Sequence, residues 1–291
     1  MMKIRTDLAL ECRELAPNDC YGIESEELSV GDAKITRIAV VDHRGEEALG
    51  KPQGHYITIE VPPFAEEGVA DDTRRSAVTV ELSRMLPKEG TILIAGLGNG
   101  DITPDALGPK AAQKILATRH ISSDLARSLG LGELRSVSVI APGVLGKTGM
   151  ETVEILRGAV EQIHPAAVIV IDAMASRRLS RLGCTVQLSD TGIIPGSGVG
   201  NKRKEINEAT LGVPVISLGV PTVVDAQTLA KDLLVKHPDD SLEDMEQHGD
   251  QMVVTPREID TLITHAADLV ALSVNCALHP HLSPELITSL V

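Results

Sequence analysis

Aromatic side chains are almost absent from this sequence. Its 291 residues include no Trp, one Phe (Phe64) and two Tyr (Tyr21 and Tyr56). Proteins that bind single strands of nucleic acid stack bases on aromatic side chains, and this chain lacks such platforms. Positive charge is also scarce, because 27 Lys and Arg stand against 41 Asp and Glu, a formal net charge of −14. Such a surface repels phosphate backbones, so we expect no direct nucleic-acid partner.

Paired cysteines and long apolar runs are missing as well. The four cysteines show no C-x-x-C spacing, so we expect free thiols in a reducing compartment. The start MMKIRTD leads into no apolar region of a signal peptide, and no apolar run approaches the length of a membrane span. The sequence predicts a cytoplasmic protein with no membrane partner.

Strand and helix patterns alternate along most of the chain. Apolar β-branched runs predict strands at 34–41, 55–61, 91–96, 136–141, 167–172, 184–188 and 213–218. Helical spacing predicts helices at 71–86, 105–119, 148–163, 221–235 and 256–277. Residues 4–11 fit a short extended segment or an N-terminal arm, and the acidic stretch 236–251 fits a surface loop or a short helix. The alternation predicts one α/β domain over residues 1–291, with three layers around a central, mostly parallel twisted sheet.

Two aspartates follow apolar strands of that sheet. In the stretch 91–109 a buried strand is followed by a glycine turn and then by Pro104 and Asp105 at a helix start. Asp172 closes the apolar run AVIVI, so little solvent should reach its carboxylate. In open α/β sheets, ligands and chemistry gather at the carboxyl ends of the strands.

Such a pair of carboxylates suits acid–base chemistry on a water molecule. Burial and a second nearby carboxylate both raise a carboxyl pKa, so the two acids could share a proton at neutral pH. The plainer interpretation fits the pattern equally well: Asp105 only caps its helix and Asp172 only accepts bonds from loop amides.

Two further motifs allow more than one interpretation. The sequence Ser-Asp-Thr-Gly at 189–192 matches the aspartic protease signature, but it occurs once in an α/β pattern, so a loop acid that bonds backbone amides is favoured for Asp190. The glycine-rich segment 192–201, followed by Lys202, Arg203 and Lys204, could cradle an anion or an acidic side chain. A structural or partner-binding loop is the favoured interpretation of this segment. The segment departs from the Walker loop, and GLGNGD at 96–101 lacks the third glycine of the dinucleotide fingerprint.

Nearly the whole chain resembles the germination protease family of spore-forming bacteria. The resemblance rests on IRTDLALE (4–11), GLGN (96–99), TPDALGP (103–109), TRH (118–120), APGVLGKTGMET (141–152), IDAMASR (171–177), QLSDTGIIPGSGVGNKRKE (187–205), GVPTVVDA (219–226) and MVVTPREID (252–260). It implies an endopeptidase that begins the degradation of small acid-soluble spore proteins in the spore core. It also implies a homotetramer, a precursor that cuts off its own N-terminus, and a fold related to the hydrogenase maturation endopeptidases. The family's two essential aspartates correspond to Asp105 and Asp172.

The family cuts after an acidic residue and before a hydrophobic one. Asp7 and Leu8 match such a site, so we expect residues 1–7 to be a propeptide that mimics a substrate. We expect Asn99 to position the peptide carbonyl, and Lys202 and Arg203 to read the acidic residue. The family usually carries a histidine where this chain has Ile194, and we expect no metal and no cofactor.

Two functions of other classes stay open on the sequence alone. One is a maturation-type chaperone that binds a carboxylate or a metal without cutting. The other is a phosphate- or nucleotide-binding enzyme, which rests on the loop at 192–204 only.

Overall fold

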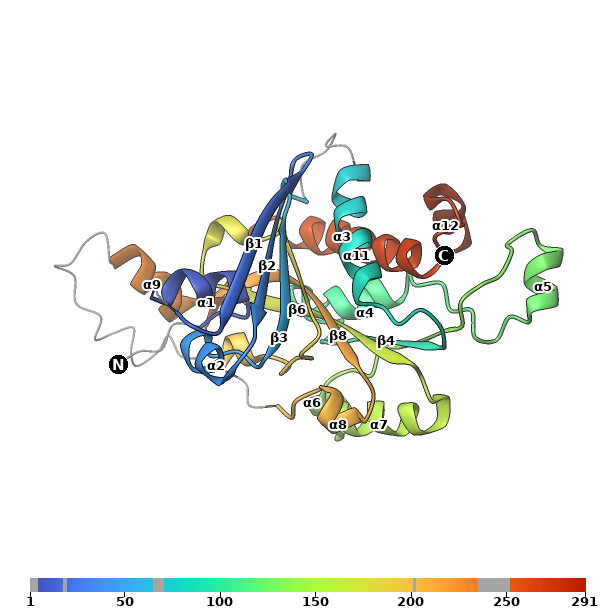
Figure 1. The fold of residues 1–291 in the computed structure, drawn as a ribbon, viewed down its shortest axis with the longest axis horizontal. Coiled ribbons are helices and arrows are strands. Elements are labelled where there is room, and N and C mark those ends of the chain that lie inside the picture. The colour runs from blue at the N-terminus through green and yellow to red at the C-terminus, as the bar shows by residue number, and fades with distance from the viewer. Residues whose placement is uncertain (1–4, 18–19, 65–70, 201–202, 235–251) are drawn as a thin grey trace.

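A single mixed sheet forms the centre of the structure (Figure 1). The structure is a computed structural model that describes residues 5–17, 20–64, 71–200, 203–234 and 252–291. Its strands are β1 (Ile23–Val30), β2 (Ala33–Val40), β3 (Gly54–Glu60), β4 (Ile92–Gly96), β5 (Val137–Ile140), β6 (Ala167–Ser176), β7 (Thr185–Ser189), β8 (Val215–Asp225) and β9 (Val253–Val254). The order is β1-β2-β3-β7-β8-β6-β4-β5, with β9 paired to β8. The α/β class is confirmed.

Parallel pairing is confined to one half of this sheet. Strands β5, β4, β6 and β8 pair in parallel, whereas β1, β2, β3 and β7 form an antiparallel extension that joins β8. The expected pattern of mostly parallel strands therefore describes the half that carries Asp172, and the sheet as a whole is mixed.

Helices cover both faces of the sheet (Figure 1). They are α1 (Ala9–Leu15), α2 (His43–Leu49), α3 (Asp71–Met85), α4 (Leu107–Ala112), α5 (Ser123–Ser128), α6 (Leu145–Thr148), α7 (Thr152–Ile163), α8 (Glu208–Leu211), α9 (Ala226–Leu234), α11 (Ile259–Leu278) and α12 (Pro284–Leu290). Helices α3, α4 and α11 pack on one face, and α7 and α8 pack on the other. The three predicted layers are present.

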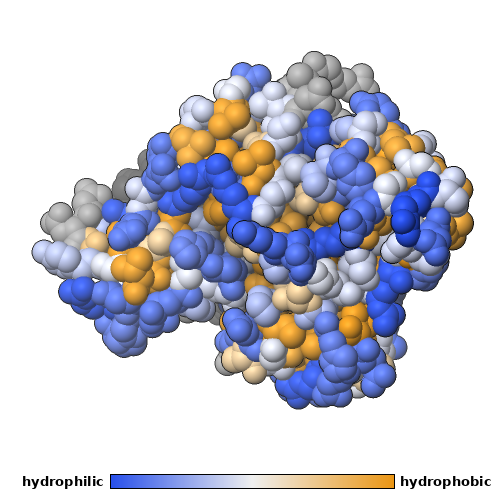
Figure 2. Space-filling view, turned by 45° about the vertical axis from the view of Figure 1, so that its right-hand side comes forward, coloured by the Kyte–Doolittle hydropathy of each residue, from blue (hydrophilic) through white to orange (hydrophobic). Residues whose placement is uncertain are grey.

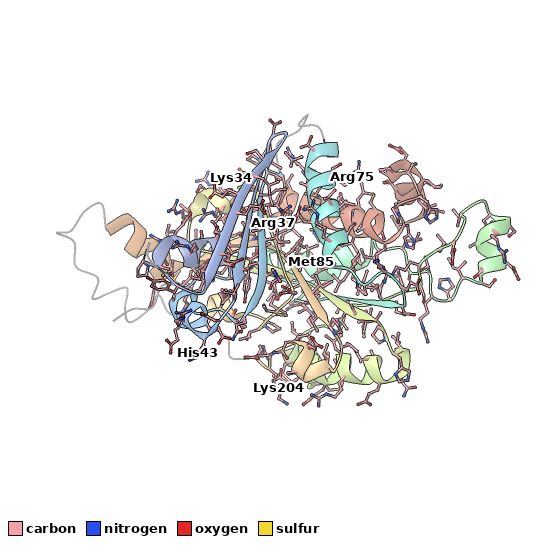
Figure 3. The ribbon with its side chains drawn as sticks, in the orientation of Figure 1. Lys34, Arg37, His43, Arg75, Met85 and Lys204 are labelled. Atoms are coloured by element: carbon pink, nitrogen blue, oxygen red, sulfur yellow. The ribbon has the colours of Figure 1, made fainter. Side chains whose placement is uncertain are left out.

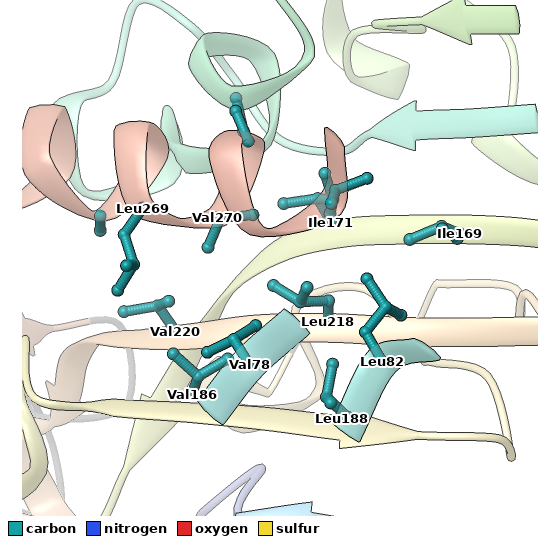
Figure 4. Packing of buried hydrophobic residues seen from close by; sticks show 14 of the residues in the cluster. Val78, Leu82, Ile169, Ile171, Val186, Leu188, Leu218, Val220, Leu269 and Val270 are labelled. Atoms are coloured by element: carbon teal, nitrogen blue, oxygen red, sulfur yellow. The ribbon is translucent and has the colours of Figure 1, made fainter. Parts of the chain in front are cut away.

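The main core lies between the sheet and the helices α3 and α11. Figure 4 shows Val78 and Leu82 of α3 over Val186 and Leu188 of β7, with Val270 of α11 close by. Aliphatic side chains fill this space, as the shortage of aromatic residues requires. Burying each of them stabilises the fold by about 1.5–3 kcal/mol.

Charged side chains attach the antiparallel extension to α3. Arg37 on β2 forms ion pairs with Glu81 of α3 at 2.8 Å and with Glu26 of β1 at 2.9 Å (Figure 3). Glu81 is 2% exposed, whereas Arg37 is 29% exposed, so the pair is only partly shielded from water. Strand β1 itself is largely exposed, which explains why no apolar pattern predicted it.

Several predicted helices are shorter than expected. The helix predicted at 105–119 is a 3-10 turn, η1 (Thr103–Asp105), followed by the short helix α4. The helix predicted to begin at residue 221 was wrong over its first five residues, because β8 runs on to Asp225 and is buried throughout. The acidic stretch at 236–251 lies outside the described residues.

Helix α11 meets the length and hydropathy of a membrane span, although no such run was recognised in the sequence. It covers Ile259–Leu278, and 67% of its apolar window is buried inside the protein. Its side chains belong to the main core.

Candidate active site

Asp172 lies in the middle of the sheet and is almost completely buried. It occupies β6 between β4 and β8 and is 4% exposed. Its Oδ1 accepts a hydrogen bond from the Ala173 N–H at 3.0 Å. Strand β6 continues to Ser176, so the expectation that Asp172 ends the strand was wrong. Pairing with β4 stops at Ile171, however, and the edge of β6 is open from Asp172 onward.

Asp105 approaches that open edge from the loop after β4. It is the last residue of η1, and its Oδ2 accepts a hydrogen bond from the Asn99 N–H at 2.8 Å. Gly98 has φ +111°, and a Cβ there would lie 2.1 Å from the Asp105 carbonyl oxygen. The glycine turn is therefore needed for this close approach.

Both carboxylates line a cavity of about 270 Å³. Asp7 and Arg203 also line it, with Thr222 of β8 at its wall. The Thr222 hydroxyl donates to the Pro104 carbonyl at 2.8 Å and thereby holds η1 against β8. The strand-end argument is thus confirmed in its spatial part, since Asp105 and Asp172 face one space.

The two aspartates differ in their affinity for a proton. Burial, followed by the negative charges of Asp105 and Asp7, raises the pKa of Asp172 well above its usual value. Burial also raises the pKa of Asp105, but the Asn99 N–H and the positive charge of Arg203 oppose that rise. Both carboxyls therefore hold a proton more firmly than an exposed aspartate does, and the rise in pKa is larger for Asp172.

The backbone and side chain of Asp7 are bound beside this pair. The Asp7 N–H donates to the Ala175 carbonyl at 2.9 Å, and the Ala175 N–H donates to Asp7 Oδ2 at 2.8 Å. The Ser197 hydroxyl donates to Asp7 Oδ1 at 2.6 Å. Asp7 thus binds the open edge of β6 through one main-chain hydrogen bond and through its carboxylate.

The peptide unit that follows Asp7 is held as firmly. The Asp7 carbonyl oxygen accepts hydrogen bonds from Lys51 Nζ at 2.9 Å and from Gln187 Nε2 at 3.0 Å. Gln187 Oε1 in turn accepts from the Ala9 N–H at 2.7 Å, and the Leu8 side chain is fully buried. The expected cleavage site therefore lies in a specific binding site.

Charged contacts fix the chain on both sides of this bond. Arg5 forms an ion pair with Asp225 at 3.1 Å, and its N–H donates to the Thr228 hydroxyl. Glu11, which is fully buried, binds Arg181 at 3.1 Å and accepts from the Arg177 N–H at 2.6 Å. Residues 9–15 form helix α1, so the extended alternative for 4–11 was wrong after Leu8.

Comparisons with known proteins show the family of the chain. The profile of the germination protease family matches residues 5–248. The chain belongs to the germination protease family. It is 44% identical to the germination protease of Caldanaerobacter subterraneus subsp. tengcongensis, over 98% of this chain and 97% of that protein. It is 37% identical to the germination protease of Bacillus subtilis, over 97% of this chain and 95% of that protein.

Membership of this family makes the chain a protease of spore germination. Among solved structures, the hydrogenase maturation protease HycI of Thermococcus kodakarensis matches 67% of this chain and 98% of its own, at 16% identity and a TM-score of 0.38. That likeness is too weak to support conclusions about the site.

The other residues expected at the site lie in different places. The main chain of Asn99 binds Asp105, and Arg203 lines the cavity. Lys202 lies outside the described residues. Lys204 points to α7 and pairs with Glu154 at 2.9 Å (Figure 3).

Asp190 stands apart from this site. Its carboxylate accepts from the His55 N–H at 2.7 Å and contacts the His55 ring, on the exposed surface. The interpretation as a loop acid that bonds a backbone amide is confirmed. Ile194 is half-exposed, and no group of three His, Cys, Asp or Glu side chains in the described ranges could hold a metal ion. The cysteines are free thiols.

Sequence reasoning missed the groups that bind Asp7. Gln187, Lys51 and Ser197 lie 180, 44 and 190 residues from it along the chain. The only local signal was the glycine-rich segment that could cradle an acidic side chain. Among the described residues of this segment, the Ser197 hydroxyl makes the contact with the Asp7 carboxylate.

The buried proton of Asp172 predicts a pH-dependent stability difference. Because the folded pKa is raised, this group stabilises the fold below the unfolded pKa of about 4, and the contribution is lost as pH rises toward the folded pKa. The asparagine of the Asp172→Asn variant does not titrate. The melting temperature of the variant minus that of wild type should therefore increase between about pH 4 and pH 7. Thermal unfolding of uncleaved chains measures this, with exposed Asp124→Asn as the control. A difference that stays constant with pH would contradict the prediction.

Proposed function

We propose that the protein is an endopeptidase that begins the degradation of small acid-soluble spore proteins during germination. It cuts after Asp or Glu and before a hydrophobic residue. The observation that carries this proposal is the binding of Asp7 and Leu8, a match to that preference, beside a cavity lined by two carboxylates. Membership of the germination protease family agrees with it.

In this proposal the two aspartates divide the proton transfers. We assign Asp105 as the ionised member. Burial raises its pKa, but less than that of Asp172, because the Asn99 N–H and Arg203 favour the charged form, and it takes a proton from the attacking water. Asp172 is the protonated member and donates to the nitrogen of the leaving peptide. Nothing in this division requires a cofactor.

The same contacts support a precursor that processes itself. Asp7 is bound at the edge of β6, and hydrolysis after Asp7 would release residues 1–7 and open that edge. Until then the segment blocks the site. We infer that the working enzyme is a homotetramer in the cytoplasm of the spore core, as the family resemblance implies.

Digestion of a purified small acid-soluble spore protein tests this function. We expect the processed enzyme to begin at Leu8 and to cut the substrate only after acidic residues. Edman sequencing of the enzyme and mass spectrometry of the fragments measure both. A different mature N-terminus would contradict the site assigned to the propeptide. An uncut spore protein would contradict the proposed substrate.

A further inference from the structure

The Asp7 carboxylate lies in a small pocket between β6 and the glycine-rich loop. Its two oxygens accept from different donors, Oδ2 from the Ala175 N–H and Oδ1 from the Ser197 hydroxyl. Gly198 closes the pocket, because a Cβ at this position would lie 2.2 Å from Asp7 Oδ2 and 2.5 Å from the Ala175 Cβ. The pocket therefore fits a carboxylate and leaves no space for a side chain at residue 198.

Backbone contacts decide which residue of a peptide enters this pocket. The Asp7 N–H binds Ala175, and the Asp7 carbonyl oxygen binds Lys51 and Gln187. These bonds lie on both sides of the Asp7 Cα, so they fix its register on β6. The side chain that points into the pocket then belongs to the residue that precedes the bond to Leu8.

The pocket is connected to the aspartates through the sheet. Gln187 pairs with Gly219 of β8, and Gly219 pairs with Asp172 of β6, so the three residues lie in one row across three strands. Neighbours in such a row point to the same face. The Met174 side chain covers Gly219, where a Cβ would lie 2.4 Å from its methyl carbon. The group that holds the Asp7 carbonyl is thus anchored in the same row as Asp172.

We propose that Ser197, the Ala175 N–H and Gly198 form the subsite that recognises the acidic residue before the cleaved bond, while Lys51 and Gln187 hold that residue's carbonyl. This inference rests on the proposed function. In the precursor the subsite contains Asp7, and once residues 1–7 leave it is open to the Asp or Glu of a substrate. Recognition depends on hydrogen bonds from these donors to a carboxylate. Such bonds are stronger than hydrogen bonds between neutral groups.

This assignment does not use Arg203 and Lys204, the two basic residues of the loop that the structure describes. The positive charge of Arg203 acts on Asp105, and Lys204 pairs with Glu154. Arg203→Ala should therefore slow cleavage of acidic and neutral peptides alike, without changing the preference between them.

Competition between two peptides tests the subsite. The peptides span residues 1–14, one with Asp7 and one with Asp7→Ala, and mass spectrometry gives the ratio of their kcat/KM values. The enzymes are the full chain and its Ser197→Ala variant, both processed by a trace of tagged wild type that is then removed. We expect Ser197→Ala to lower the preference for the acidic peptide by about 10- to 100-fold, the range for a lost bond to a charged group. Its kcat/KM on the Asp7→Ala peptide should stay within about threefold of wild type.

Two further variants sharpen this test. Ser180 is an exposed serine of η2 (Leu179–Arg181), and Ser180→Ala should leave the preference unchanged. Gly198→Ala should place a methyl group where the carboxylate lies, so it should turn the preference toward the smaller side chain.

The possible failures can be told apart. An unchanged preference in Ser197→Ala or in Gly198→Ala would overturn the subsite and leave the proposed function standing. Equal losses on both peptides in Ser197→Ala would also overturn it, because a merely structural role predicts that result. If wild type cuts neither peptide, the proposed function fails and the subsite fails with it.

Discussion

Asp172→Asn is expected to slow peptide cleavage by on the order of 10²- to 10⁴-fold, the usual contribution of a positioned acid or base. Asparagine has nearly the shape of aspartate and carries no charge, so it removes the proton donor without opening a cavity. The folded state should be no less stable, because Asp172 is almost fully buried and its ionised form is unfavourable there. Rates on a peptide of residues 1–14, with thermal unfolding of the same samples, measure both effects.

Asp190→Asn is the matched control for this substitution. It changes an aspartate in the Ser-Asp-Thr-Gly motif, whose carboxylate bonds His55 on the exposed surface. Its rate should stay close to that of wild type. A large loss with Asp190→Asn and none with Asp172→Asn would show that the wrong motif has been assigned to catalysis.

Gly108→Ala is expected to destabilise the protein by about 1–3 kcal/mol, as overpacking does in well-packed cores. Gly108 lies in α4, where the helix meets the loop after β4. An added Cβ would lie 2.2 Å from the Leu97 carbonyl oxygen and 2.5 Å from the Ile171 carbonyl oxygen. These are backbone atoms, and the Leu97 N–H already binds the Ile171 carbonyl at 2.8 Å, so they cannot move aside without breaking that bond. We expect a melting temperature lower by several degrees, about 2–4 °C per kcal/mol.

A glycine-to-alanine substitution at a different position should stabilise the protein instead. Gly158 lies within α7 on the exposed surface, and nothing lies within 4 Å of an added Cβ. Alanine favours a helix over glycine by up to about 1 kcal/mol, so Gly158→Ala should raise the melting temperature. Similar shifts in both variants would mean that contact with the backbone at Gly108 does not decide its effect.

The sequence predicts the parallel half of the fold well, because three of its four strands, β4, β6 and β8, are buried on both faces. Runs such as 167–172 are continuous and apolar, and they place Asp172 correctly in a dry part of the sheet. Strand β1 gives no such signal, since its residues are mostly polar and exposed. The start of β8 was recognised, but its end was missed and a helix was expected from residue 221. In the structure Pro221 pairs with Met174 beside a bulge, one of the few positions at which a sheet accepts proline.

The site was only partly predictable, because some of its residues lie far apart along the chain. Asp105 and Asp172 follow from local rules about strands and turns. The binding of Asp7 depends on Lys51, Gln187 and Ser197, and no local pattern connects these residues. The surface gives little help, since hydrophobic patches are scattered among hydrophilic residues on the face in Figure 2.

Self-processing of the intact precursor tests the central claim most directly. Wild type, Asp105→Asn and Asp172→Asn are incubated alone, and intact mass is followed with time. The account predicts that wild type loses residues 1–7 and that both variants stay whole. Equal loss of this segment from all three chains would contradict it, because cleavage would then come from a group other than the two aspartates.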